Sequence, residues 1–189
     1  LALQVGVPFI VDFLNKVGAF YVNIVRNTPL TLIIVFCNIG FIVNLGMSFT
    51  NDIARNNIIW AIIGLSFYHA AFVCEALRSG VNTVPVGQAE AARSIGLTFS
   101  QSLSEVLLPQ AFRGAITPLG NTLIALTKNT TVATAIGVAE ISGLMKEMME
   151  FRPDLIFVIF FLVALGFVIL TLPVGILTTR LSTKLAVKR

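Results

Sequence analysis

The chain has 189 residues, of which 56% are hydrophobic and 12% charged, about half the roughly 25% charged residues of a soluble domain. So few polar side chains cannot cover a soluble surface, which excludes an ordinary cytosolic enzyme, a disordered tail and a disulfide scaffold. The net charge is +4, but the basic residues lie between apolar blocks, so we expect a membrane protein that does not bind nucleic acid.

Residues 1–26 are predicted to form an amphipathic helix. Phe9, Phe13, Val17, Phe20 and Ile24 recur at helical spacing, while the polar residues fall elsewhere on the wheel. This pattern is typical of a helix that lies along the membrane interface, here before the chain turns inward at Pro29. The chain has no initiating Met.

Four apolar segments are long enough to cross a bilayer, which needs about 20 mostly apolar residues. We expect an all-α polytopic membrane protein whose spans cover about residues 28–48, 58–77, 115–138 and 155–178. Residues 27–179 then form the transmembrane domain, and residues 180–189 form a basic tail.

The distribution of Lys and Arg predicts the orientation. Residues 1–26, the loop 78–113 and the C-terminal tail together carry nine Lys and Arg, and the opposite side carries three. The nine-residue side is therefore expected to be cytoplasmic, with the C-terminus inside. The opposite loop, Glu140 to Asp154, is acidic.

The cytoplasmic loop 78–113 is much longer than a normal helix connection and carries helix signals of its own. Pro85 and Gly96 are expected to bound a short helix in which Glu90 and Arg93 form an i,i+3 pair of opposite charge. Thr98 to Gln101 matches a capping box for a second helix, which Pro109 would disturb. The local pattern fits either a surface helical hairpin or a docking element for a soluble partner.

A longer series of residues favours docking. Glu90-Ala91-Ala92, then Gly96, then Val106-Leu107-Leu108-Pro109 resembles the EAA signature of ABC importer permeases, which usually has Ile in place of Val106. The surroundings are similar to the polar amino-acid branch of that family. The segments that match in order are Tyr21–Leu30, Glu75–Gly80, Pro85–Gln88, Pro109–Ala111, Pro118–Asn121, Leu126–Thr131 and Ile136–Glu140.

The resemblance implies the transmembrane domain of a type I ABC importer, in a bacterial inner membrane. Two permease subunits, as a homodimer or heterodimer, would form the pathway, two cytoplasmic ATPases would supply energy, and an extracellular binding protein would deliver the solute. The coupling helix would carry Gly87, Glu90, Ala91, Ala92, Arg93 and Gly96, with Pro109 following. This branch usually has five spans, so we expect the first span to lie upstream of Leu1.

No cofactor is expected on this chain. It lacks the Gly-x-x-x-x-Gly-Lys-[Ser/Thr] phosphate loop, so ATP and Mg²⁺ are expected on the partner ATPase, and the chain itself is not expected to be an enzyme. A membrane-embedded enzyme would need a cluster such as His-Glu-x-x-His or paired intramembrane Asp, and neither is present. A gated channel is a second alternative, which would need no ATPase.

Polar residues at membrane depth are candidates for the solute pathway. Lys128 lies about 20 Å from either end of its span, too far for its stem to reach a flat interface. With Asn129, Thr130, Thr131 and Asn121 it is predicted either to line the pathway and attract a solute carboxylate, or to serve an ion pair or helix packing. The resemblance around Thr127–Thr131 makes glutamate or glutamine the leading solute, with another small polar solute as the alternative.

Other polar residues are expected to be structural. Glu75 and Arg78 should pair with each other, and His69 should form hydrogen bonds in the core rather than sense pH. Asn38 and Asn44 are candidates for hydrogen bonds between helices.

Overall fold

The computed structural model describes residues 2–185, with side chains from Val11 onward, and within that range the regular structure is entirely helical, as predicted. The α-helices are α1 (Ala2–Arg26), α2 (Leu30–Phe36), α3 (Ile53–Asn82), α4 (Val86–Ser94), α5 (Phe99–Gln101), α6 (Leu108–Asn129), α7 (Ile141–Phe151) and α8 (Ile156–Leu185). Two π-helical segments, η1 (Cys37–Asn44) and η2 (Ser102–Leu107), and two 3₁₀ segments, η3 (Thr130–Ile136) and η4 (Pro153–Leu155), complete the order.

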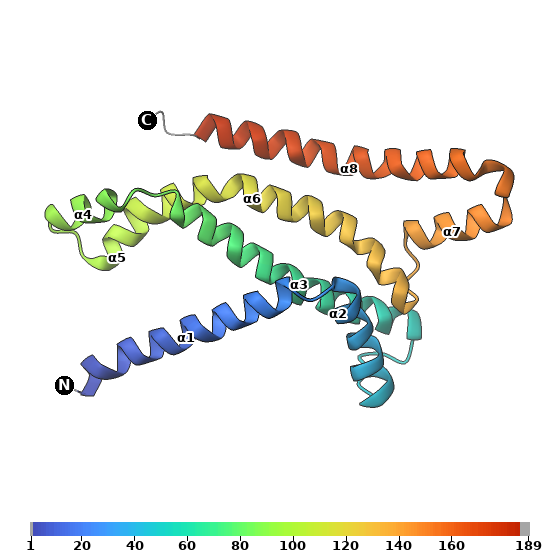
Figure 1. Cartoon of the computed structure of the whole chain (residues 1–189), viewed down its shortest axis with the longest axis horizontal. Helices are drawn as coiled ribbons and strands as arrows, with labels where there is room; N and C mark the ends of the chain where they lie inside the picture. Colours follow the sequence, from blue (N-terminus) through green and yellow to red (C-terminus); the bar gives the residue numbers. More distant parts are fainter. Residues whose placement is uncertain (1, 186–189) are drawn as a thin grey trace.

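The long helices α3, α6 and α8 lie side by side, with α6 between the other two (Figure 1). The short helices α4 and α5 project at one end of the molecule, where the C-terminal end of α8 also lies. At the opposite end, α7 leads from η3 into α8. The loop 78–113 therefore lies at the same end of the molecule as the C-terminal end of α8, which contains the first residues of the predicted tail.

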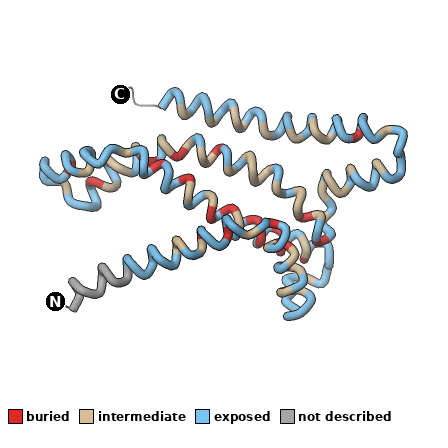
Figure 2. The backbone as a smooth tube through the Cα atoms, viewed as in Figure 1, coloured by how far each residue is buried: buried red, intermediate tan, exposed pale blue. Residues whose placement is uncertain are grey.

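The core is small and lies where α2, α3 and η3 meet. Leu30 and Ile34 of α2 pack there against Ala61 and Leu65 of α3. A second cluster joins the end of α1 to α3 through three buried residues, Val22, Val25 and Ala71. Figure 2 shows that α8, in contrast, is a mixture of exposed and intermediate residues with hardly any buried ones, which suits a helix that contacts lipid or a second subunit.

Two described helices, Ile53–Asn82 and Pro153–Leu185, are long and apolar enough to cross a membrane. They contain the predicted spans 58–77 and 155–178. A third candidate is the pair Val11–Arg26 and Leu30–Asn44, which is bent by 101° and contains most of the predicted span 28–48. Such a bend is what an interfacial helix before a span requires, and the placement of residues 1–26 at the interface stays a prediction.

The helix type changes within the predicted span 115–138. The α-helix ends at Asn129, and η3 continues the segment as a 3₁₀ helix to Ile136, followed by Gly137 with φ of 74°. Helix α8 continues through the first part of the predicted tail to Leu185, and residues 186–189 lie outside the described residues.

Small residues allow α3 and α6 to pack closely against each other. A Cβ atom on Gly80 would collide with the backbone carbonyl of Ala111 and lie 2.7 Å from the Cβ of Ala115, and one on Gly114 would lie 3.1 Å from the carbonyl oxygen of Gly80. Ala111 and Ala115 are buried in this contact. The two backbones therefore meet without side chains between them, next to the loop that they carry.

Candidate functional site

The first candidate site is the tip of the molecule formed by α4 and α5. Helix α4 begins after Pro85, and the chain turns at Gly96, whose φ is 85°. The capping box of Thr98 and Gln101 is present, as predicted. The second helix is only three residues long and passes into π-helical η2, and Pro109 lies in the first turn of α6. Pro109 has no N–H to donate to the preceding turn, and the wider π-helical turn of η2 lies directly before it. This change of helix type is the disturbance that was predicted at Pro109.

The residues of the predicted coupling helix divide between the surface and the interior. Ala92 is 3% exposed and lies on the face of α4 that packs against η2. Gly87, Glu90, Ala91 and Arg93 are exposed. A Cβ atom on Gly87 would meet no atom within 4 Å, so the space above α4 is open to another backbone.

Glu90 and Arg93 do not form the expected ion pair with each other. Neither side chain has an ion-pair partner among residues 11–185. Both charges therefore remain available to a second protein.

Three large apolar side chains also project from the tip, and sequence reasoning missed them. Val86, Ile95 and Phe99 are 76%, 78% and 80% exposed. The signal that could have found them is the presence of these apolar residues in a loop predicted to be cytoplasmic. Exposed apolar side chains beside unpaired charges are typical of a protein-binding surface.

Near the tip, Glu75 of α3 forms two ion pairs. The predicted pair with Arg78 is confirmed, with 2.8 Å between the guanidinium nitrogen and the carboxylate oxygen. Arg26, at the end of α1, reaches the other carboxylate oxygen at 2.7 Å and lies 5.8 Å from the centre of the Phe72 ring. Sequence spacing could not indicate this second pair, because 49 residues separate its members.

The second candidate site is the corner where α6 becomes η3. Lys128 lies in the last turn of α6, where its charge suits the negative end of the helix dipole, and it is exposed. Within residues 11–185 its ammonium group has no ion-pair partner. Asn121 is exposed two turns earlier, so it lies on the same face of α6.

The hydroxyl groups of the two threonines at this corner donate hydrogen bonds to backbone carbonyls of their own segment. Thr130 donates to the carbonyl of Thr127 at 2.8 Å, and Thr131 donates to the carbonyl of Lys128 at 2.8 Å. Asn129 instead faces α3, where its amide nitrogen lies 3.2 Å from Nε2 of His69. His69 is buried and hydrogen-bonded, as predicted.

A chain of hydrogen bonds holds the other end of η3. The amide of Asn38 donates to Asn57 of α3 at 3.3 Å, and the amide of Asn57 donates to the carbonyl of Ile136 at 2.8 Å. The predicted role of Asn38 between helices is therefore confirmed. The prediction for Asn44 was wrong, since its amide donates to the carbonyl of Ile39 within its own segment.

The acidic loop 140–154 contains the amphipathic helix α7, and Glu140 caps its start. Its carboxylate accepts hydrogen bonds from the hydroxyls of Ser142 and Thr134 and from the backbone N–H groups of Ser142 and Gly143. Partial burial raises the pKa of this carboxyl, but the four hydrogen bonds outweigh burial and lower it below its ordinary value.

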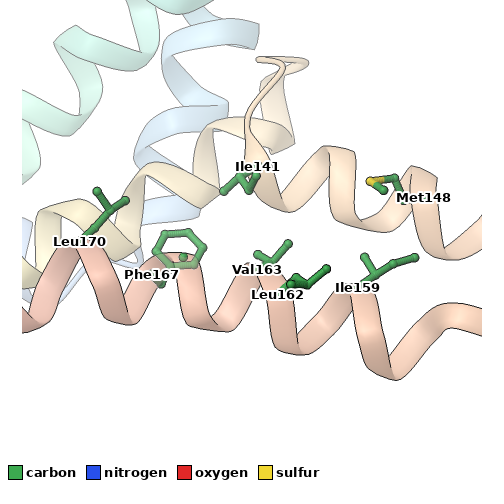
Figure 3. A pocket seen from close by; sticks show the side chains of 8 residues that line it. Ile141, Met148, Ile159, Leu162, Val163, Phe167 and Leu170 are labelled. Carbon is green, nitrogen blue, oxygen red and sulfur yellow. The ribbon is translucent and has the colours of Figure 1, made fainter.

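An apolar groove of about 370 Å³ runs between α7 and α8 (Figure 3). Ile141 and Met148 form one wall, and the side chains from Ile159 to Leu170 form the other. No polar side chain lines it, so the groove offers nothing to orient a polar solute. The described residues also contain no group of His, Cys, Asp and Glu that would hold a metal ion.

A family model described as "Binding-protein-dependent transport system inner membrane component" matches residues 7–187. The glutamate transport system permease protein GluC of Corynebacterium efficiens is 52% identical over 184 residues, which cover 95% of this chain and 81% of that protein. The probable glutamine ABC transporter permease protein GlnM of Bacillus subtilis is 35% identical over 180 residues, which cover 93% and 79%.

Solved structures show the same fold. An amino acid ABC transporter crystallised with histidines gives a TM-score of 0.77 at 25% identity and covers 89% of this chain and 75% of that one. The inward-facing MetNI methionine ABC transporter gives 0.71 at 23% identity and covers 93% and 76%.

Proposed function

Because the chain belongs to the family of binding-protein-dependent transport system inner membrane components, we propose that it is the permease subunit of an ABC importer for glutamate or glutamine. Its transmembrane fold is that of amino-acid ABC importers. The solute itself is the finer part of the proposal, and the names of the relatives support it.

The proposed assembly contains two permease subunits, two cytoplasmic ATPases and an extracellular solute-binding protein. ATP and Mg²⁺ bind to the ATPases, where hydrolysis takes place. The permease lies in the bacterial inner membrane, with the α4–α5 tip and the C-terminus in the cytoplasm.

The observation that carries the proposal is the construction of the tip. Helix α4 presents the unpaired charges of Glu90 and Arg93 together with exposed apolar side chains. The loop is flanked by α3 and α6, which meet backbone to backbone at Gly80 and Ala111. A partner that moves α4 therefore moves both helices as one body, and this movement switches access to the pathway.

The solute path is proposed to pass the corner at Lys128. A broken helix at membrane depth is tolerated where it lines a cavity, and the exposed ammonium group there attracts a carboxylate. The same path is proposed to be lined by Asn129, Thr130 and Thr131 at this corner and by Asn121, two turns before Lys128 on the same face of α6.

The test is uptake of labelled glutamate and of labelled glutamine by the reconstituted complex carrying Glu90→Lys. We expect loss of uptake and of copurification with the ATPase, because the reversed charge faces the partner. Glu147→Lys on α7 makes the same charge change on an exposed residue at the other end of the molecule and should retain both. Full uptake by the Glu90→Lys complex would remove the coupling role, and uptake without any ATPase would identify a channel.

A further inference from the structure

His69 is buried in the middle of α3 and makes one hydrogen bond with each ring nitrogen. It is 5% exposed. Nδ1 lies 2.9 Å from the carbonyl oxygen of Leu65, one turn earlier, and Nε2 lies 3.2 Å from the side-chain amide nitrogen of Asn129 on α6. The ring thus connects a spanning helix to the end of α6.

These two contacts determine the tautomer. A carbonyl oxygen only accepts hydrogen bonds, so Nδ1 carries the proton. In the neutral ring Nε2 then has a free lone pair, and it accepts from the amide N–H of Asn129. The donor and acceptor roles of His69 are therefore both used.

The same contacts orient the amide of Asn129. With its nitrogen directed at His69, the amide oxygen Oδ1 points away from the ring. Within residues 11–185 no group donates a hydrogen bond to this oxygen. Lys128, the adjacent residue, has an ammonium group without an ion-pair partner in the same range.

Asn129 thus offers a free acceptor one residue after the free cation of Lys128 in the sequence. An α-amino acid carries the complementary groups, an ammonium group and a carboxylate, on one carbon. We propose that His69 is a positioning residue that holds Asn129 so that Oδ1 accepts a hydrogen bond from the solute's α-ammonium group, while Lys128 attracts its carboxylate. This inference rests on the proposed solute path at Lys128 and adds the residue that makes the path selective for amino acids.

The experiment measures binding of labelled glutamate to the permease–ATPase complex in nanodiscs, without the solute-binding protein. Unlabelled glutamate and glutarate, which lacks the α-ammonium group, compete for the site. The readout is the ratio of their affinities. A site that hydrogen-bonds the ammonium group prefers glutamate.

His69→Leu keeps a similar volume but lets the amide of Asn129 turn. We expect the preference for glutamate over glutarate to fall about tenfold, the effect of one lost hydrogen bond to a charged group. His69→Gln keeps an acceptor for Asn129 and a donor for Leu65, and it should retain most of the preference. Phe72→Leu alters packing beside the ring, whose centre lies 6.2 Å from that of His69, and should not change the ratio.

A double-mutant cycle separates positioning from packing. If His69 acts through Asn129, then His69→Leu does not change the ratio further in an Asn129→Ala background. An unchanged ratio in His69→Leu, or additive effects in the cycle, would overturn the inference alone. Failure of the wild-type complex to bind glutamate, or no loss of affinity in Lys128→Met, would overturn the proposed path as well.

Discussion

The guanidinium group of Arg26 lies 2.7 Å from the carboxylate of Glu75, although 49 residues separate them in the sequence. Glu75 holds Arg78 with its other oxygen, so one carboxylate ties the end of α1 to α3. The bend of 101° between α1 and α2 begins directly after Arg26. Glu75 therefore stabilises the angle at which the N-terminal helix leaves the bundle.

Removing the carboxylate of Glu75 should lower the stability of the protein more than removing either arginine. Glu75→Gln loses both ion pairs, whereas Arg26→Gln and Arg78→Gln lose one each, and partly exposed pairs of this kind contribute about 0.2–1 kcal/mol each. The apparent Tm of the complex in nanodiscs should fall most for Glu75→Gln, and the difference should shrink in high salt. Equal values for the three variants would show that the pairs do not share one site.

Gly80→Ala should destabilise the transmembrane domain by about 1–3 kcal/mol, the usual cost of overpacking, because the new methyl group meets backbone atoms of α6 that cannot rotate away. Its apparent Tm should fall, and less solute should be imported per ATP hydrolysed. Gly166→Ala on α8 is the matched control, since a Cβ atom there meets nothing within 4 Å. The same Tm for both variants would mean that α3 and α6 are not closely packed.

The carboxylate of Glu140 should make stability depend on pH in acid. Its folded pKa is lowered, so the stabilisation is complete above the unfolded pKa of about 4.5 and is lost as the pH falls through the folded value. Glu140→Gln should flatten the fall of apparent Tm as the pH drops below about 4.5. Glu147→Gln, an exposed residue of the same helix, should leave the slope as in the wild type.

Phe99→Ser and Ile95→Ser should each weaken ATPase binding about tenfold, since apolar side chains at the centre of an interface contribute about 1–2 kcal/mol. The apparent Tm of the permease alone should not change, because both side chains are exposed in the chain. Phe151→Ser makes the same substitution at the other end, on α7, and should bind the ATPase normally. Affinity is measured by titrating nanodisc-held permease with purified ATPase.

Several of the correct predictions concern helix ends, a cap and an ion pair, which depend on residues close together in the sequence. Pro85 and Gly96 bound α4, Thr98 and Gln101 form their capping box, and Glu75 pairs with Arg78. Each of these features depends on residues within about one helical turn, where the allowed backbone angles and side-chain reach are known in advance. The coupling role, which the local pattern left open, is implied by the family resemblance and stays a prediction.

Contacts between distant segments could not be predicted in the same way. His69 and Asn129 are 60 residues apart, and nothing in the spacing of either segment indicates the other. The end of α6 at Asn129 was not predicted either, because the segment was identified as a span from its length and apolar composition alone. The segment becomes 3₁₀-helical where it is held from the side, by Asn57 bound to the carbonyl of Ile136.

The exposed apolar side chains of the tip affect how long an unassembled subunit survives in the cell. A newly inserted subunit that lacks the proposed ATPase partner leaves Val86, Ile95 and Phe99 exposed. Chaperones and proteases recognise such side chains, so an orphan subunit is expected to be degraded faster than an assembled one. Cellular levels of this permease should therefore follow the synthesis of the protein that buries its tip.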